Sequence, residues 1–111
     1  MSQYGCRGRT WPPITRTIPD LRVTNYDLMQ RDVTIEVTDE AHETVFVAER
    51  SITRGGDLTC RSVFPMTGTY QLTISLRYGA TTTTTHTVTP DRKGICLDIH
   101  PDSIDTYSVS Q

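Results

Sequence analysis

The sequence predicts an all-β fold, an antiparallel two-sheet sandwich of seven or eight strands behind an extended N-terminal arm. Apolar and polar residues alternate with a period of two in several short runs, and no run has the period of an amphipathic helix. Turn residues separate these runs at close spacing, as they do in two-layer β domains. The 111 residues suffice for one domain of this kind.

The first segment, residues 1–19, is the predicted extended basic arm. Its prolines favour extended backbone, and its sequence lacks the alternation of a strand. Arginine and tryptophan are the residue types that most often dominate protein interfaces. The residues that we expect to bind a neighbouring subunit are Arg7, Arg9, Trp11, Ile14 and Arg16. The competing possibility is that Trp11 folds back onto its own domain and closes an end of the core.

Residues 20–111 form the predicted sandwich. Its clearest strand is 68–76, where Tyr70, Leu72, Ile74 and Leu76 alternate with small polar residues. Leu72 and Ile74 stand in the middle of this run, so we expect them in the core. The other strands that alternation predicts lie at 21–23, 33–37, 43–52, 58–64, 81–89, 95–99 and, as a short edge strand, 104–109.

Charge and hydropathy exclude several classes of function. The net charge of −2 gives no general attraction to nucleic acid. No stretch approaches the roughly 20 apolar residues of a membrane span, and no apolar signal-peptide core follows Met1. We therefore expect no nucleic-acid partner, no membrane span and no export by a signal of the chain's own.

Catalytic and metal-binding patterns are weak. The sequence has no Gly-x-Ser-x-Gly elbow and no phosphate-binding glycine loop, so we expect neither an enzyme nor a cofactor. Cys60, Cys96, His86 and His100 include none of the close pairs typical of zinc sites. A further cluster, Asp98, Asp102 and Asp105, lacks the glycine-punctuated spacing of a calcium loop and is better interpreted as a solvated turn.

Three cysteines allow one disulfide and one free thiol. Cys60 and Cys96 lie in separate predicted strands, and a bridge between them would close a loop of about 35 residues and add roughly 3 kcal/mol. The alternative is two buried thiols in a reducing compartment. Cys6 lies in the arm, where we expect it to be free.

Gly68-Thr69-Tyr70, followed by an alternating strand, resembles the sixth strand of immunoglobulin-like folds. In those folds a tyrosine near the start of the strand donates a hydrogen bond back across the preceding corner. The resemblance implies this role for Tyr70 and an immunoglobulin-like sandwich for the domain. A plain core tyrosine is the alternative.

A wider resemblance covers residues 20–100. The segments Leu21 to Asp27, Val33 to Val37 and Glu43 to Phe46 resemble small surface-associated domains of halophilic archaea. Those domains carry a V-x-N-x-D strand before a hairpin, and cysteines at the places of Cys60 and Cys96. This body is less acidic than is usual there, and the lipid-anchoring signal of the exported relatives is missing.

These features together predict a non-enzymatic structural or interaction module. An extracytoplasmic kind of domain without a leader would suit a virion, as a capsid decoration or minor structural protein of a virus of halophilic archaea. It would bind protein subunits of a larger assembly through its arm and be oligomeric there. The alternative is a cell-surface adhesion or ligand-binding domain, and a more remote one is a small metal or redox protein.

Overall fold

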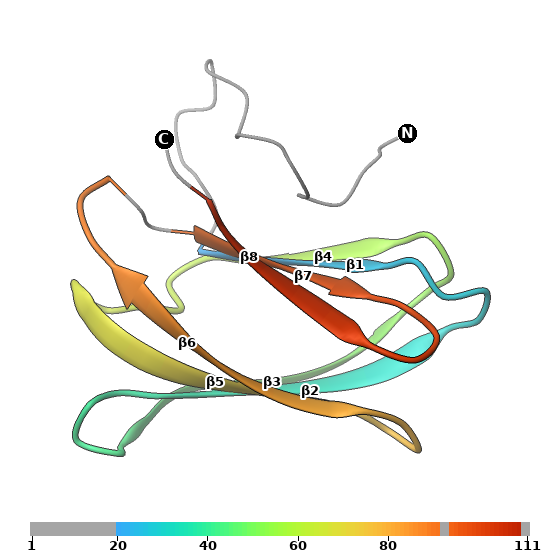
Figure 1. Cartoon of the computed structure of the whole chain (residues 1–111), viewed down its shortest axis with the longest axis horizontal. Helices are drawn as coiled ribbons and strands as arrows, with labels where there is room; N and C mark the ends of the chain where they lie inside the picture. The colour runs from blue at the N-terminus through green and yellow to red at the C-terminus, as the bar shows by residue number, and fades with distance from the viewer. Residues whose placement is uncertain (1–19, 92–93, 110–111) are drawn as a thin grey trace.

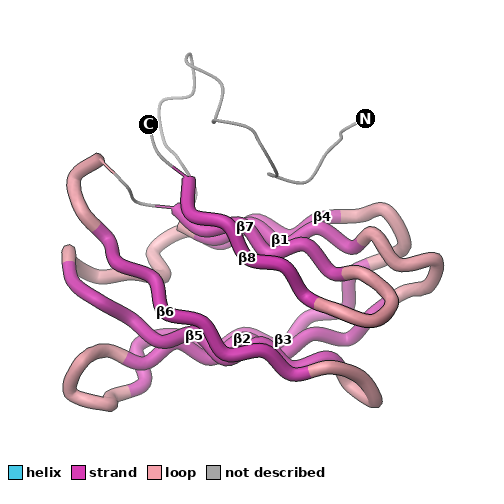
Figure 2. The backbone as a smooth tube through the Cα atoms, in the orientation of Figure 1, coloured by secondary structure: helices cyan, strands magenta, loops and turns pink. Residues whose placement is uncertain are grey.

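The computed structural model describes residues 20–91 and 94–109, and these form an all-β sandwich of two four-stranded sheets without a helix (Figures 1 and 2). The fold class predicted from alternation is confirmed. The strands are β1 (Leu21–Asn25), β2 (Arg31–Thr38), β3 (Thr44–Ile52), β4 (Asp57–Cys60), β5 (Gly68–Leu76), β6 (Thr81–Val88), β7 (Gly94–Ile99) and β8 (Ile104–Val109).

The strand order is β4-β1-β7-β8 in one sheet and β3-β2-β5-β6 in the other. Three hairpins, β2–β3, β5–β6 and β7–β8, join neighbours in sequence. The sheets are not wholly antiparallel as predicted, because β1 pairs with β7 in parallel, with Leu21 opposite Ile95. A parallel pair needs a long connection, and here five strands separate its members along the chain.

The core lies between the two sheets and consists of the apolar members of the alternating runs. Leu72 and Ile74 are fully buried in β5, as predicted. The other strands contribute the same kind of branched side chain, so the two inner faces interdigitate as sandwich sheets do. The largest apolar side chains with almost no exposure are Leu21, Val23, Val33, Ile35, Val37, Val63, Leu72, Ile74, Ile95, Leu97 and Ile99.

A tyrosine corner closes one end of the core. The Tyr70 hydroxyl donates to the Met66 carbonyl at 2.7 Å, and its oxygen lies 3.3 Å from the Met66 amide. The Phe64 ring packs against both Tyr70 and His86, with ring centroids 5.0 and 5.1 Å apart. The hydrogen bond that the resemblance implied for Tyr70 is therefore present, inside an aromatic cluster.

The predicted strand over 58–64 is too long, because β4 ends at Cys60. The backbone turns at Ser62, whose φ is 61°. Val63 and Phe64 are nonetheless buried, and their amides donate to one carboxylate oxygen of Asp20 at 2.8 and 3.0 Å. A side chain from the start of β1 thus replaces the strand partner that buried amides require.

The predicted bridge between Cys60 and Cys96 is wrong, since Cys60 is a free cysteine. The register of β1 gives the reason. Cys60 is opposite Leu21, whereas Cys96 is opposite Arg22, the next residue along β1. Successive side chains on a strand point to opposite faces. Cys60 therefore contacts the core, and Cys96 lies on the outer face of the same sheet.

Candidate functional site

The sequence-predicted site residues do not converge on one site. Arg7, Arg9, Trp11, Ile14 and Arg16, the predicted subunit contacts, lie outside the described residues. Tyr70 is part of the core. Burial raises the pKa of the Cys60 thiol above its usual value.

The residues considered as metal ligands are dispersed as well. His86 is buried on the inner side of β6, while His100 follows β7 and lies 3.3 Å from the Asp105 carboxylate. Across the part of the chain that the structure describes, no three His, Cys, Asp or Glu side chains are grouped to hold a metal ion. Those residues also include no helix of the length and apolarity that would span a membrane.

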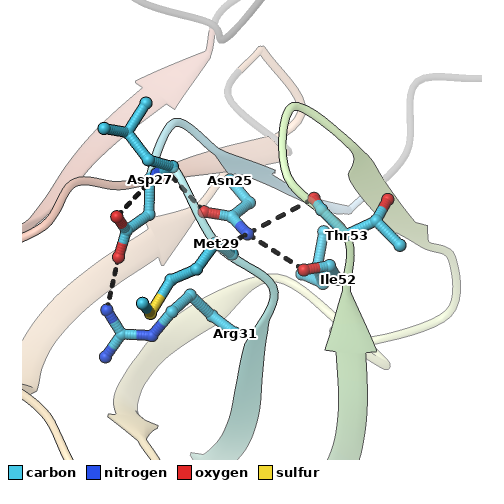
Figure 3. A network of polar contacts seen from close by, with 7 residues as sticks. Asn25, Asp27, Met29, Arg31, Ile52 and Thr53 are labelled. Atoms are coloured by element: carbon cyan, nitrogen blue, oxygen red, sulfur yellow. Dashed lines mark hydrogen bonds and ion pairs between the residues drawn. The ribbon is translucent and has the colours of Figure 1, made fainter.

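The best-built polar arrangement is at the end of the sandwich where β1 passes into β2 (Figure 3). Asn25 is fully buried at the end of β1. Its amide nitrogen donates to the carbonyls of Met29, Ile52 and Thr53 at 2.9, 2.9 and 3.3 Å. Its amide oxygen accepts from the Asp27 N–H at 2.9 Å. One side chain thus fastens the β1–β2 loop to the end of β3.

Asp27 extends the polar network across the β1–β2 loop. One carboxylate oxygen accepts from the Leu28 amide and the other pairs with the Arg31 guanidinium, both at 2.6 Å. Both side chains are almost buried. The hydrogen bond from Arg31 holds the pKa of Asp27 below its usual value, so the ion pair is intact at neutral pH. The loop between these residues is therefore held in one conformation.

Arg31 also shapes the neighbouring β5–β6 turn. Its guanidinium passes so close to Gly79 that a Cβ at this position would collide with it. The Arg77 amide donates to the Asp32 carbonyl at 2.9 Å, next to Arg31 in β2. The β1–β2 loop and the β5–β6 turn are thus two parts of one arranged surface.

Tyr78 stands at the tip of this turn and is the most unusual residue in it. Its φ is 60°, a left-handed backbone that costs a non-glycine residue roughly 1–2 kcal/mol. Its side chain is 91% exposed, so no burial offsets the strain. The Arg77 guanidinium lies 5.0 Å from the ring centroid, within cation–π range. A strained, exposed aromatic residue favours a role outside the fold.

Leu28 and Met29 extend the apolar character of this end, with 74% and 61% of their surface exposed. Met29, Arg31, Arg77 and Tyr78 line a shallow hollow of about 310 Å³. We call Leu28, Met29, Arg77 and Tyr78 the loop-end surface. Methionine, tyrosine and arginine are the types enriched in protein interfaces, so this composition suits a protein partner.

The sequence predicts only a turn over residues 25–31. The signal that points to the network is the V-x-N-x-D spacing of Val23, Asn25 and Asp27. Tyr78 carried no comparable signal, because a Tyr-Gly pair in a turn does not reveal which residue takes the positive φ.

Comparison of the sequence with protein-family models finds no match, and a comparison with curated proteins finds no significant similarity.

Proposed function

We propose that this protein is a non-enzymatic structural or interaction module that binds a partner protein through its loop-end surface. The observation that carries the proposal is Tyr78, a large aromatic side chain that is fully presented to solvent at a backbone position suited to glycine or asparagine. The ring does not pack into the core, and its cation–π contact with Arg77 lies at the surface. A partner pocket that receives the ring would explain it.

The chemistry of the surface indicates the chemistry of the partner. Leu28, Met29 and the Tyr78 ring would fill an apolar pocket, and the Arg77 guanidinium would meet carboxylates at its rim. Arg77 is 64% exposed and its ion pair with Asp32 is loose, at 3.8 Å, so the guanidinium is free to reorient toward a partner. An apolar centre with a charged rim is the usual anatomy of a protein interface.

For the biological setting, we propose a virion protein of a virus of halophilic archaea, with a cell-surface adhesion or ligand-binding domain as the second candidate. The virion setting rests on the sequence resemblance. The hydrogen bond of Tyr70 supports an immunoglobulin-like classification of the domain. The second would be favoured by a concave sheet face lined with aromatics. On the described strands, the outer face of β3-β2-β5-β6 carries mainly threonines, which include Thr69 and Thr87 in mutual contact at 3.1 Å.

Site-specific photo-cross-linking tests the loop-end surface. The photoreactive phenylalanine analogue p-benzoylphenylalanine would replace Tyr78 in cells or particles that contain the chain, and Thr83 in a matched control. Thr83 is also exposed but lies on the outer face of β6. We expect one discrete protein adduct from position 78 and none from position 83. Equal labelling from both positions, or no adduct at 78, would contradict the proposal.

Two further variants sharpen this test. Met29→Ser should reduce the adduct yield by removing apolar contact, and Arg77→Glu should reduce it by opposing the partner's carboxylates. Co-sedimentation of the adduct with virus particles or with cell envelopes then separates the two biological settings. An adduct insensitive to both substitutions would mean that the partner contacts another part of this end.

A further inference from the structure

The centre of the outer face of the β4-β1-β7-β8 sheet is buried, although it points away from the core, whereas Asp57 and Thr59 on the edge strand β4 are exposed. Thr24 in β1 is 4% exposed, and its neighbours on this face in β7, Cys96 and Asp98, are 0% and 2% exposed. Their neighbours along the strands, Val23 in β1 and Ile95, Leu97 and Ile99 in β7, belong to the core. Among the described residues, no strand or loop lies over this side of the sheet (Figures 1 and 2).

The other sheet shows that neighbouring strands alone do not hide such side chains. Thr34 and Thr73 occupy the two central strands of β3-β2-β5-β6 on its outer face, and both remain partly exposed. Glu36, directly opposite Thr73 in the register, is exposed. Central position in a sheet therefore leaves an outward side chain accessible. The burial of Thr24, Cys96 and Asp98 requires a cover.

The polar groups of this buried surface are suited to contact with a covering chain segment. The Thr24 hydroxyl is buried and has no hydrogen-bond partner in the described part of the chain. Buried hydroxyls are normally satisfied, so a polar group on a covering segment could stabilise this one. Asp98 and the nearby Asp105 give the face an acidic character.

Residues 1–19 match this face in position, length and charge. They lead directly into Asp20 and β1, a central strand of this sheet. Nineteen residues reach up to about 60 Å when extended, and the longest dimension of the domain is 35 Å. They contain three arginines and no acidic residue. Trp11 and Ile14 add apolar side chains that can exclude water.

The cysteines provide an independent link. Cys60 is free and lies on the core side, so it cannot serve as the partner of Cys96. The third cysteine of the chain is Cys6, within the segment that matches the face in charge and reach. We propose that residues 1–19 cover the outer face of β1 and β7 in their own chain, and that Cys6 forms a disulfide with Cys96.

The bond forms by thiol–disulfide exchange. An oxidised dithiol oxidoreductase, or a small disulfide such as oxidised glutathione, accepts two electrons and two protons. The Cys6 and Cys96 S–H bonds break, the S–S bond forms, and the oxidant leaves as two thiols. This assignment does not depend on the loop-end surface, and it gives the arm a different role from the subunit contact expected from the sequence.

Peptide mapping tests the pairing, because trypsin separates the three cysteines. Residues 1–7, 55–61 and 94–111 form tryptic peptides with one cysteine each. The full chain would be treated with oxidised glutathione, alkylated with iodoacetamide in denaturant and digested without reductant. We expect 1–7 joined to 94–111, with 55–61 alkylated. Any other pairing, or alkylation of all three peptides, would overturn the proposal.

The oligomeric state of the cross-linked product decides whose arm is bound. Non-reducing electrophoresis should show a monomer, since the bond lies within one chain. A covalent dimer with the same peptide pair would mean that the arm of a second copy covers the face, and would overturn the assignment to the chain's own arm.

Trp11, the only tryptophan, tests the cover separately from the bond. Acrylamide should quench its fluorescence several-fold less in the native chain than in the denatured chain, because a covering arm shields the ring. The shielding should persist in Cys6→Ser, where docking remains without the bond, and in the control Cys60→Ser. Equal quenching of the native and denatured wild-type chains would overturn the proposal.

Discussion

The two sheets of this domain share one core but differ on the sides that face away from it. On β4-β1-β7-β8 the outward Thr24, Cys96 and Asp98 are as buried as core residues, whereas on β3-β2-β5-β6 the outward residues remain open to solvent. Both faces are made mainly of polar residues. The comparison teaches that polar alternation in a strand predicts which side chains point outward, but it does not predict whether the outward side is free.

The largest expected effect concerns the inner faces, where the two sheets should behave alike. Leu72→Ala removes a fully buried side chain from the middle of β5 and should lower the free energy of unfolding by roughly 2–5 kcal/mol. The neighbouring control Gln71→Ala, on the open outer face, should stay within about 0.5 kcal/mol. Urea denaturation measures both. A small loss at Leu72 would mean that the core reorganises around β5.

A lysine placed on each outer face tests the comparison directly. Thr24→Lys must bury a charge or displace the covering layer, and should cost about 3 kcal/mol. Thr73→Lys, on a central strand of the open face, should cost less than about 0.5 kcal/mol. Thermal unfolding of the two variants gives the difference. If they unfold at the same temperature, the two outer faces are equivalent in solution.

Substitution of Asp20, which precedes β1 in the β4-β1-β7-β8 sheet, should have a smaller effect on stability. Asp20→Ala leaves the buried amides of Val63 and Phe64 without their acceptor, and should cost about 1–3 kcal/mol. Asp20→Asn keeps an oxygen acceptor and should lose less. Hydrogen exchange at the two amides is the direct measurement, since faster exchange should be confined to the 61–67 loop. Unchanged exchange would show that other groups satisfy them.

Asp27, in the loop that joins the two sheets, should make stability depend on pH. Because the pairing with Arg31 lowers the pKa of the folded-state carboxyl, its contribution is fully present above the unfolded-state pKa. That contribution is lost as the pH falls through the lower folded-state value. Asp27→Asn should therefore be less stable than wild type at neutral pH, with the difference shrinking in acid. A constant difference at all pH values would indicate a purely structural effect.

The smallest effect on stability is expected at the tip of the β5–β6 turn in the β3-β2-β5-β6 sheet. Tyr78→Asn relieves the left-handed backbone and should be neutral or stabilising by up to about 1 kcal/mol, while partner binding is lost. Differential scanning calorimetry measures the first and photo-cross-linking from position 29 measures the second. Destabilisation by this change would show that the ring supports the fold, and would remove the reason for its proposed function.

The sequence predicted the fold well where local pattern decides, and poorly where distant residues decide. Period-two alternation identified the strands and placed Leu72 and Ile74 in the core. It extended β4 too far, because the amides of Val63 and Phe64 are taken by a carboxylate more than forty residues earlier. Such a partner leaves no local trace in the pattern.

The cysteine pairing failed for a related reason. Whether two strands place their cysteines on the same face depends on their register with a third strand, and a shift of one residue reverses the answer. Cys60 opposite Leu21 and Cys96 opposite Arg22 differ by that one residue. The polar network was missed for a different reason, since the spacing of Asn25 and Asp27 was visible but the Ile52 and Thr53 carbonyls that accept from Asn25 lie at the end of β3, more than 25 residues away.

The parallel pair of β1 and β7 bears on how the chain folds during its synthesis. β1 is among the first parts of the domain to leave the ribosome, yet its partner on one side belongs to the last twenty residues. Until those emerge, β1 presents an unpaired edge and half of one sheet cannot close. Pairing over such sequence separations slows folding. We expect the domain to acquire its native structure only after β7 has been synthesised and has left the ribosome.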